Sequence, residues 1–322
     1  MWKISLISIC NLKTSYDRGF TFIIKTRSGL VSMSMFSSSQ ETVNAGFEEL
    51  VKNIEPSILE YTSVNRCRES IQNYLGQYIS SFTIDLPGAF ACTTMASPLK
   101  ESIIDMFVLF NIKHSKRFFP GELLNKLHVT LLAEYPGTTF DEATEAVYAP
   151  IGEYTFKVQP GFITDQRHYL VPAPHWNEWV AYDSPGYKSQ ILKMNAHHNG
   201  KLLHVIRMIK TWNRLSGNAF NEYFLELMVN EILVNYEIQT YQHAISHIFK
   251  AILYDVPLKQ HDPASKSLLV EGLHDLDEVV NAMLHVKCSY LVTMQALEAE
   301  AQGNMKAALS DWAQLFPEVP PS

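Results

Sequence analysis

A strand–turn–strand segment in the first third of the chain constrains the fold most. Phe82 to Leu86 has the composition of a strand, and Pro87-Gly88 predicts a turn directly after it. Ile103 to Phe110 is a continuous apolar run of strand length that only Asp105 interrupts. The segment therefore predicts a buried strand that carries one carboxylate and lies close to a glycine turn.

The other segments divide the chain into a mixed half and a helical half. Apolar spacing and turn residues predict helices over 41–54, 60–80 and 123–135, and paired strands over 146–148 and 154–158. The stretch that follows, with Trp176 and Trp179, is expected to be poor in strands. Further helices are expected at 187–196, 201–216, 220–235, 238–254, 273–302 and 304–315. This order predicts an α+β fold with two lobes and a cleft between them.

Composition limits the class of protein. The chain has 322 residues, 47 % of them hydrophobic, and a formal net charge of -7. A net negative charge argues against an extended nucleic-acid surface, because such surfaces are basic. The four cysteines are scattered and form no CxxC pair, as free thiols in a reducing compartment do. No apolar run approaches the roughly 20 residues of a membrane span, so we expect a cytoplasmic protein with no membrane partner.

Short motifs follow one another through the second half. The helix ending at Trp212 carries Arg207 and Lys210, and the sequence Tyr223-Phe224-Leu225-Glu226 comes next. Together with the Gly88 turn and the Asp105 strand, these motifs resemble the polymerase-beta-like nucleotidyltransferase superfamily. The resemblance is strongest to bacterial cyclic-oligonucleotide synthases of anti-phage signalling (CD-NTases) and to animal oligoadenylate and cyclic GMP–AMP synthases. It implies a mixed sheet with flanking helices and a C-terminal helical lobe.

The resemblance also implies a metal site, and the chain departs from it. In the superfamily a Gly-Ser turn grips a triphosphate, and an Asp-x-Asp strand and a third Asp hold two magnesium ions that align the reacting groups. Here Gly88 is kept but Ala89 replaces the Ser. The two strand positions are Ile103 and Asp105, and Lys157 stands at the third. Only Asp105 is left as a metal ligand, so we expect no bound cofactor.

Other positions match elements that contact a nucleotide in the superfamily. We expect Gly88 and Ala89, together with Thr93, to lie near the phosphates, and Lys210 to contact the triphosphate. The remaining candidates are Arg207 and Tyr223. Glu222 stands where relatives often have a Ser, and an acid there should repel a triphosphate. Arg207 and Lys210 have a competing interpretation as basic residues on an amphipathic helix that are not part of any site.

The resemblance divides the chain into three parts. Residues 36–185 correspond to the nucleotidyltransferase core with its N-terminal helices, and 186–322 to a helical domain like the oligoadenylate synthetase substrate-binding domain. Residues 1–35 are an extension, since Met33 and Met35 are candidates for the true start of translation.

Three functional hypotheses remain open. The first is a catalytically impaired pseudoenzyme that binds a nucleoside triphosphate or cyclic oligonucleotide, or regulates a protein partner from a defence system, with a Lys157–Asp105 pair in place of magnesium. The second is an active, magnesium-dependent nucleotidyltransferase that recruits Glu101 or Asp165 as ligands. The third is a non-catalytic scaffold whose cleft is filled by Phe107 and Phe156.

Histidines and tryptophans add two weaker candidates. Histidines at positions 197, 198, 204 and 247 lack cysteine or carboxylate partners at ligand spacing, so solvated or capping roles are favoured over a metal site. The tryptophans at positions 176, 179 and 212 could stack a base, but core packing is the commoner role.

Overall fold

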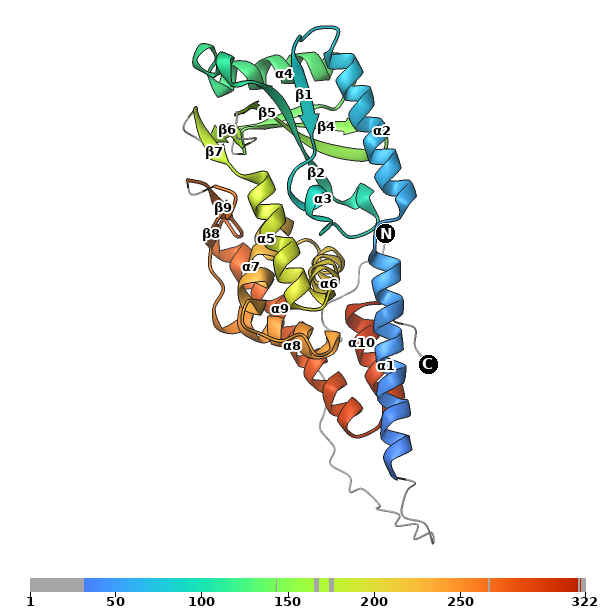
Figure 1. The fold of residues 1–322 in the computed structure, drawn as a ribbon. Helices are drawn as coiled ribbons and strands as arrows, with labels where there is room; N and C mark the ends of the chain where they lie inside the picture. Colours follow the sequence, from blue (N-terminus) through green and yellow to red (C-terminus); the bar gives the residue numbers. More distant parts are fainter. Residues whose placement is uncertain are drawn as a thin grey trace.

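A computed structural model describes residues 32–142, 144–164, 168–173, 177–265, 267–317 and 319, and within these a seven-stranded sheet lies at one end of the molecule and a helical lobe at the other (Figure 1). The strands are β1 (Phe82–Asp85), β2 (Ile103–Asn111), β3 (Thr139–Asp141), β4 (Ala146–Ile151), β5 (Tyr154–Ile163), β6 (Tyr169–Ala173) and β7 (Glu178–Tyr182). Their order is β1-β2-β5-β4-β3, with β6 paired to β5 and β7 to β6. The mixed α+β architecture expected from the sequence is confirmed.

The two central strands, β2 and β5, run parallel and all other neighbours in the sheet run antiparallel. One face of these strands is covered by α2 (Ile58–Leu75) and α4 (Pro120–Glu134), which share a core with them. Ile104 and Phe156 are register partners on that covered face and are both fully buried. Alternation along a strand then directs Asp105 and Lys157 to the opposite face.

The helical lobe contains most of the second half of the chain. Its helices are α5 (Ser184–His197), α6 (Lys201–Leu215), α7 (Glu222–Leu233), α8 (Tyr241–Tyr254), α9 (Leu276–Ala301) and α10 (Met305–Leu315). The long first helix, α1 (Ser32–Ile54), lies beside α10 (Figure 1) and contributes to the same core, where the Phe47 ring meets Trp312 edge-on at 5.0 Å. The buried face of α1 thus packs with the helical lobe. The division of the chain into residues 1–35, 36–185 and 186–322 stays a prediction.

Several element predictions need correction. The stretch expected to be poor in strands forms β6 and β7, a hairpin that continues the sheet from β5. The helix predicted over 60–80 ends at Leu75, because Gly76 caps it and turns follow. The small hairpin of β8 (Lys259–His261) and β9 (Leu269–Glu271) was not anticipated. Residues 1–31, the first candidate stacking residue Trp176 and the alternative ligand Asp165 lie outside the described residues.

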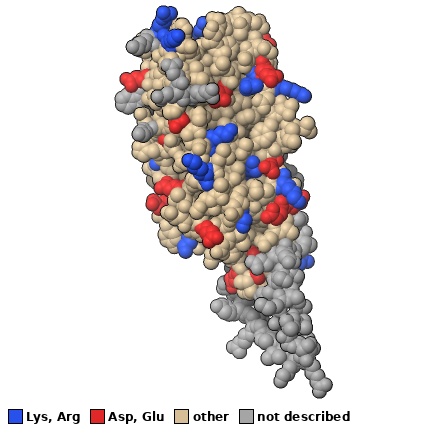
Figure 2. All heavy atoms as spheres, viewed as in Figure 1, with Lys and Arg blue, Asp and Glu red and all other residues tan. Residues whose placement is uncertain are grey.

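On the face in Figure 2, Lys and Arg are interspersed with Asp and Glu and form no basic stripe. The cysteines at positions 67, 92 and 288 are free thiols. Among the described residues, every helix is too short or too polar to cross a membrane.

Candidate functional site

The candidate site lies on the face of the sheet that is turned toward the helical lobe. The parallel register of β2 and β5 pairs Asp105 with Lys157. Ile103 lies two residues before Asp105 in β2, so its side chain is on the same face of the sheet. Ile103 is 53 % exposed, so a hydrocarbon side chain borders the open part of this face. The three positions that the resemblance assigns to metal ligands are therefore neighbours in space, and they carry one carboxylate, one hydrocarbon and one amine.

The Gly88 turn lies directly against this face. Gly88 opens the short helix α3 (Gly88–Cys92) with φ +61°, and a Cβ at that position would stand 3.1 Å from Asp105 Oδ2. The turn thus lies against the carboxylate, as the sequence predicts. Ala89 offers no hydroxyl, and its carbonyl accepts the backbone N–H of Thr94.

The residues on this face do not fit a two-magnesium site. Magnesium requires several oxygen ligands in near-octahedral geometry, and the described residues contain no group of three histidine, cysteine or acidic side chains able to hold a metal. Burial raises the pKa of the Asp105 carboxyl, and the charges of Lys157 and Lys210 lower it only in part. Glu101, the alternative ligand, is exposed in the 3-10 turn Leu99–Glu101.

The proposed contact pair between Lys157 and Asp105 is not formed. The two side chains are register partners and interact through their charges, yet no contact ion pair or hydrogen bond of Lys157 occurs among the described residues. Lys157 is half-buried. It is a cation on the cleft face whose ammonium has free donor capacity.

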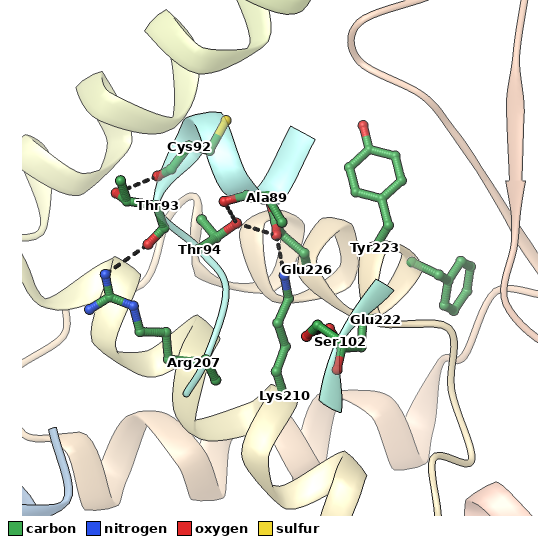
Figure 3. A network of polar contacts seen from close by, with 12 residues as sticks. Ala89, Cys92, Thr93, Thr94, Ser102, Arg207, Lys210, Glu222, Tyr223 and Glu226 are labelled. Carbon is green, nitrogen blue, oxygen red and sulfur yellow. Dashed lines mark hydrogen bonds and ion pairs between the residues drawn. The ribbon is translucent and has the colours of Figure 1, made fainter. Parts of the chain in front are cut away.

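Lys210 is engaged in a buried ion pair (Figure 3). Its Nζ lies 2.5 Å from Glu226 Oε2, and both side chains are at most 1 % exposed. Thr94 donates to the same carboxylate oxygen at 2.6 Å, and the Tyr187 hydroxyl donates to Oε1 at 2.7 Å. A buried carboxylate requires partners of this kind. The lysine expected to contact a triphosphate thus forms an ion pair with Glu226 instead. Through these contacts Glu226 of α7 connects α6, α5 and the turn after α3.

Arg207 and Thr93 also contact each other rather than an open site (Figure 3). Arg207 is 4 % exposed; its guanidinium reaches Glu55 Oε1 at 3.1 Å and the Thr93 carbonyl at 2.8 Å. The Thr93 hydroxyl donates to the Cys92 carbonyl. These contacts fasten the turn after α3 to α6 and to the end of α1.

The sequence did not single out Arg214, which neutralises Glu222. Arg214 Nε lies 2.9 Å from Glu222 Oε1, its NH2 group donates to the Ala96 carbonyl at 3.0 Å, and Ser102 donates to the same glutamate at 3.0 Å. Arg207, Lys210 and Arg214 follow at helical spacing along one side of α6, which is the signal in the sequence that could have identified this set. The acid expected to repel a triphosphate is therefore paired.

Tyr223 and Phe107 pack in the hydrophobic cluster between the sheet and the helical lobe. The Tyr223 hydroxyl donates to Asp262 Oδ1 at 2.9 Å, and burial raises the pKa of that carboxyl. Phe107 is 5 % exposed and meets the rings of Tyr169 and Tyr182 edge-on. Phe156 points to the other face of the sheet and takes no part in filling the cleft.

The weaker candidates have structural roles. Trp212 is buried and donates to Ser289, and Trp179 packs on Phe162 and donates to the Phe118 carbonyl. His204 hydrogen-bonds Tyr241 at 2.7 Å, and the His247 ring stacks on Tyr236. The histidines of the described chain belong to no metal-binding group.

Comparison with known proteins finds a matching domain family and similar relatives. Residues 42–195 match the Second Messenger Oligonucleotide or Dinucleotide Synthetase (SMODS) domain family. A cyclic AMP-AMP-AMP synthase of Acinetobacter is 22% identical over 230 residues, which cover 66% of this chain and 64% of that protein. The chain thus spans just under two thirds of that relative's length.

Solved structures share the fold at low sequence identity. CdnC of E. coli MS115-1, determined with ATP, superposes with a TM-score of 0.62 at 14% identity over 86% of this chain and 96% of its own. CdnC has also been solved in complex with a HORMA protein, with a TM-score of 0.61 at 14% identity over 87% of this chain and 97% of its own. The Vibrio cholerae cyclic AMP-GMP synthase DncV, in complex with a linear intermediate, gives 0.57 at 12% identity over 90% and 91%.

Proposed function

Because the chain is a polymerase-beta-like nucleotidyltransferase that resembles bacterial cyclic-oligonucleotide synthases, we propose that it is a catalytically impaired member that binds a nucleotide and acts in regulation. The setting we propose is bacterial anti-phage signalling, inside the cell and with a protein partner from the same defence system. CdnC, which forms a complex with a HORMA protein, is a precedent for a partner of this kind.

One observation carries this proposal. The three neighbouring positions on the cleft face hold Ile103, Asp105 and Lys157, and a hydrocarbon and an ammonium cannot replace two carboxylates around divalent ions. The engagement of Lys210 with Glu226 adds to it, because the lysine that would contact a triphosphate is already neutralised. Two-metal phosphoryl transfer therefore lacks two of its three metal ligands and one of its phosphate contacts.

Lys157 makes nucleotide binding without a divalent ion chemically reasonable. It is the register partner of Asp105, whose carboxylate lies against the Gly88 turn, and its ammonium has no contact partner in the described chain. An ammonium can neutralise part of a phosphate charge directly, and a charge-assisted hydrogen bond contributes about 1.5–3 kcal/mol. We expect a nucleotide to bind in the cleft through this lysine.

Calorimetric titration tests nucleotide binding. We expect at least one nucleoside triphosphate or cyclic oligonucleotide to bind with the same affinity in magnesium and in EDTA. Lys157→Ala should weaken binding by about tenfold or more. Lys126→Ala, which removes an exposed lysine of α4 from the far side of the sheet, should leave it unchanged. Binding that requires magnesium would contradict the proposal and favour the active enzyme with ligands recruited from elsewhere.

A second candidate function, a non-catalytic scaffold, is favoured by the contacts between the lobes. Glu226 and Arg214 each join the helical lobe to the segment 94–102, and Phe107 packs in the hydrophobic cluster between the sheet and the helical lobe. If no nucleotide binds in either buffer, the scaffold replaces nucleotide binding as the better description of the chain.

A further inference from the structure

The long helix α9 is apolar on two opposite sides. Its inner side packs into the helical core through Ala282, Val286, Ser289, Thr293 and Ala296. Its outer side carries large apolar side chains that are about half exposed or more: Leu276 75 %, Val280 51 %, Leu284 57 %, Leu291 53 % and Met294 47 %. Contiguous exposed apolar surface of this kind marks interaction sites in soluble proteins.

The outer side has the spacing of a coiled-coil seam. Val280, Leu284, Lys287, Leu291, Met294 and Glu298 follow one another at alternating steps of four and three residues, and all six are exposed. This period keeps one stripe of a helix facing a partner helix.

The two charged members of the stripe identify the partner. Lys287 and Glu298 lie at equal distances along the helix from a point between Val292 and Thr293, and so do Leu291 and Met294. If a second α9 lies antiparallel across that point, Lys287 meets Glu298 of the second copy, and Leu291 meets its Met294. Two copies in this arrangement are related by a twofold axis, so each of these contacts occurs twice in the dimer, as in any isologous interface. The central part of the stripe, Lys287 to Glu298, is thus complementary to itself in charge and in apolar character and fits a second copy of this chain.

We propose that this protein forms a homodimer through antiparallel packing of the outer sides of α9. The second half of α9 runs to the end of the helical lobe away from the sheet, where it turns into α10 (Figure 1). A dimer formed there leaves the cleft face of both copies free. The dimer is independent of whether the cleft binds a nucleotide.

Sedimentation velocity of the full chain over a concentration series tests the dimer. We expect a concentration-dependent dimer, and Leu291→Asp should raise its dissociation constant by about tenfold or more. The matched control is Val129→Asp, which changes a 61 % exposed apolar residue on α4 and should leave the dimer intact. Circular dichroism of each variant establishes that it is folded.

A charge exchange tests the register. Lys287→Glu and Glu298→Lys should each weaken the dimer, because each places like charges together at two symmetric points. The double variant should restore dissociation to within about threefold of the native chain, because both pairs are re-formed with reversed sign. A native chain that stays monomeric, a dimer that Leu291→Asp does not weaken, or a double variant no better than the single ones would each overturn the proposal.

Discussion

Lys210→Met lowers the free energy of unfolding by about 3–5 kcal/mol, because it leaves the Glu226 carboxylate buried without a counter-charge. Methionine has nearly the length of the lysine stem, so little packing is lost. Thr94 and Tyr187 still donate to the carboxylate, but two neutral donors do not offset the desolvation of a full charge. Equilibrium unfolding in urea measures the loss.

Two further variants separate this effect from a general loss of packing. Lys210→Met combined with Glu226→Gln should recover much of the lost stability, because a glutamine is neutral: its carbonyl oxygen can accept from one of the two hydroxyls, and its amide can donate to the other. Lys126→Met, at an exposed position of α4, should change stability by less than about 0.5 kcal/mol. A loss below about 1 kcal/mol in Lys210→Met would mean that the buried pair does not contribute as described.

We expect Ile103→Asp combined with Lys157→Asp to give the chain a magnesium response and the native chain to show none. The two new carboxylates would stand beside Asp105 on one face of β2 and β5, and oxygen ligands in such a group suit magnesium. At a magnesium concentration ten times the dissociation constant, binding stabilises the folded state by about 1.4 kcal/mol. Thermal unfolding with magnesium and with EDTA measures this as a rise in Tm of a few degrees.

The matched control is Ile103→Asn combined with Lys157→Asn. It changes the same two positions to side chains of similar size without adding charge, so it should show no magnesium response. A native chain whose Tm rises with magnesium as much as that of the aspartate variant would contradict the conclusion that the residues present do not fit the metals.

The strands β2 and β5 could be predicted because they have strong local signals in the sequence. The neighbourhood of Asp105 and Lys157 was expected only from the resemblance, and the parallel register of the two strands makes them partners. The hairpin of β6 and β7 was missed because Pro172 and the polar residues around it weaken the strand pattern. Pro172 is tolerated there in a two-stranded extension at the edge of the sheet.

The partners of the basic residues could not be predicted from the sequence. Whether Lys210 contacts a phosphate or a protein group depends on Glu226 from α7 and on Thr94, which is 132 residues away from that glutamate. Arg207 likewise meets Glu55, which is 152 residues distant. Helix periodicity indicated which side of α6 these residues occupy, but it carried no information about which elements cover that side. Charged residues on a helix were therefore assigned as ligand contacts when they join the two lobes.

The most direct measurement is an assay of the unmodified chain with the four nucleoside triphosphates, radiolabelled at the α-phosphate, in magnesium or manganese. We expect no linear or cyclic oligonucleotide product, because Asp105 is the only carboxylate on the cleft face among the three positions that would hold the metals. A metal-dependent product that is lost in Asp105→Ala and retained in Lys157→Ala would contradict catalytic impairment. It would identify the chain as an active synthase.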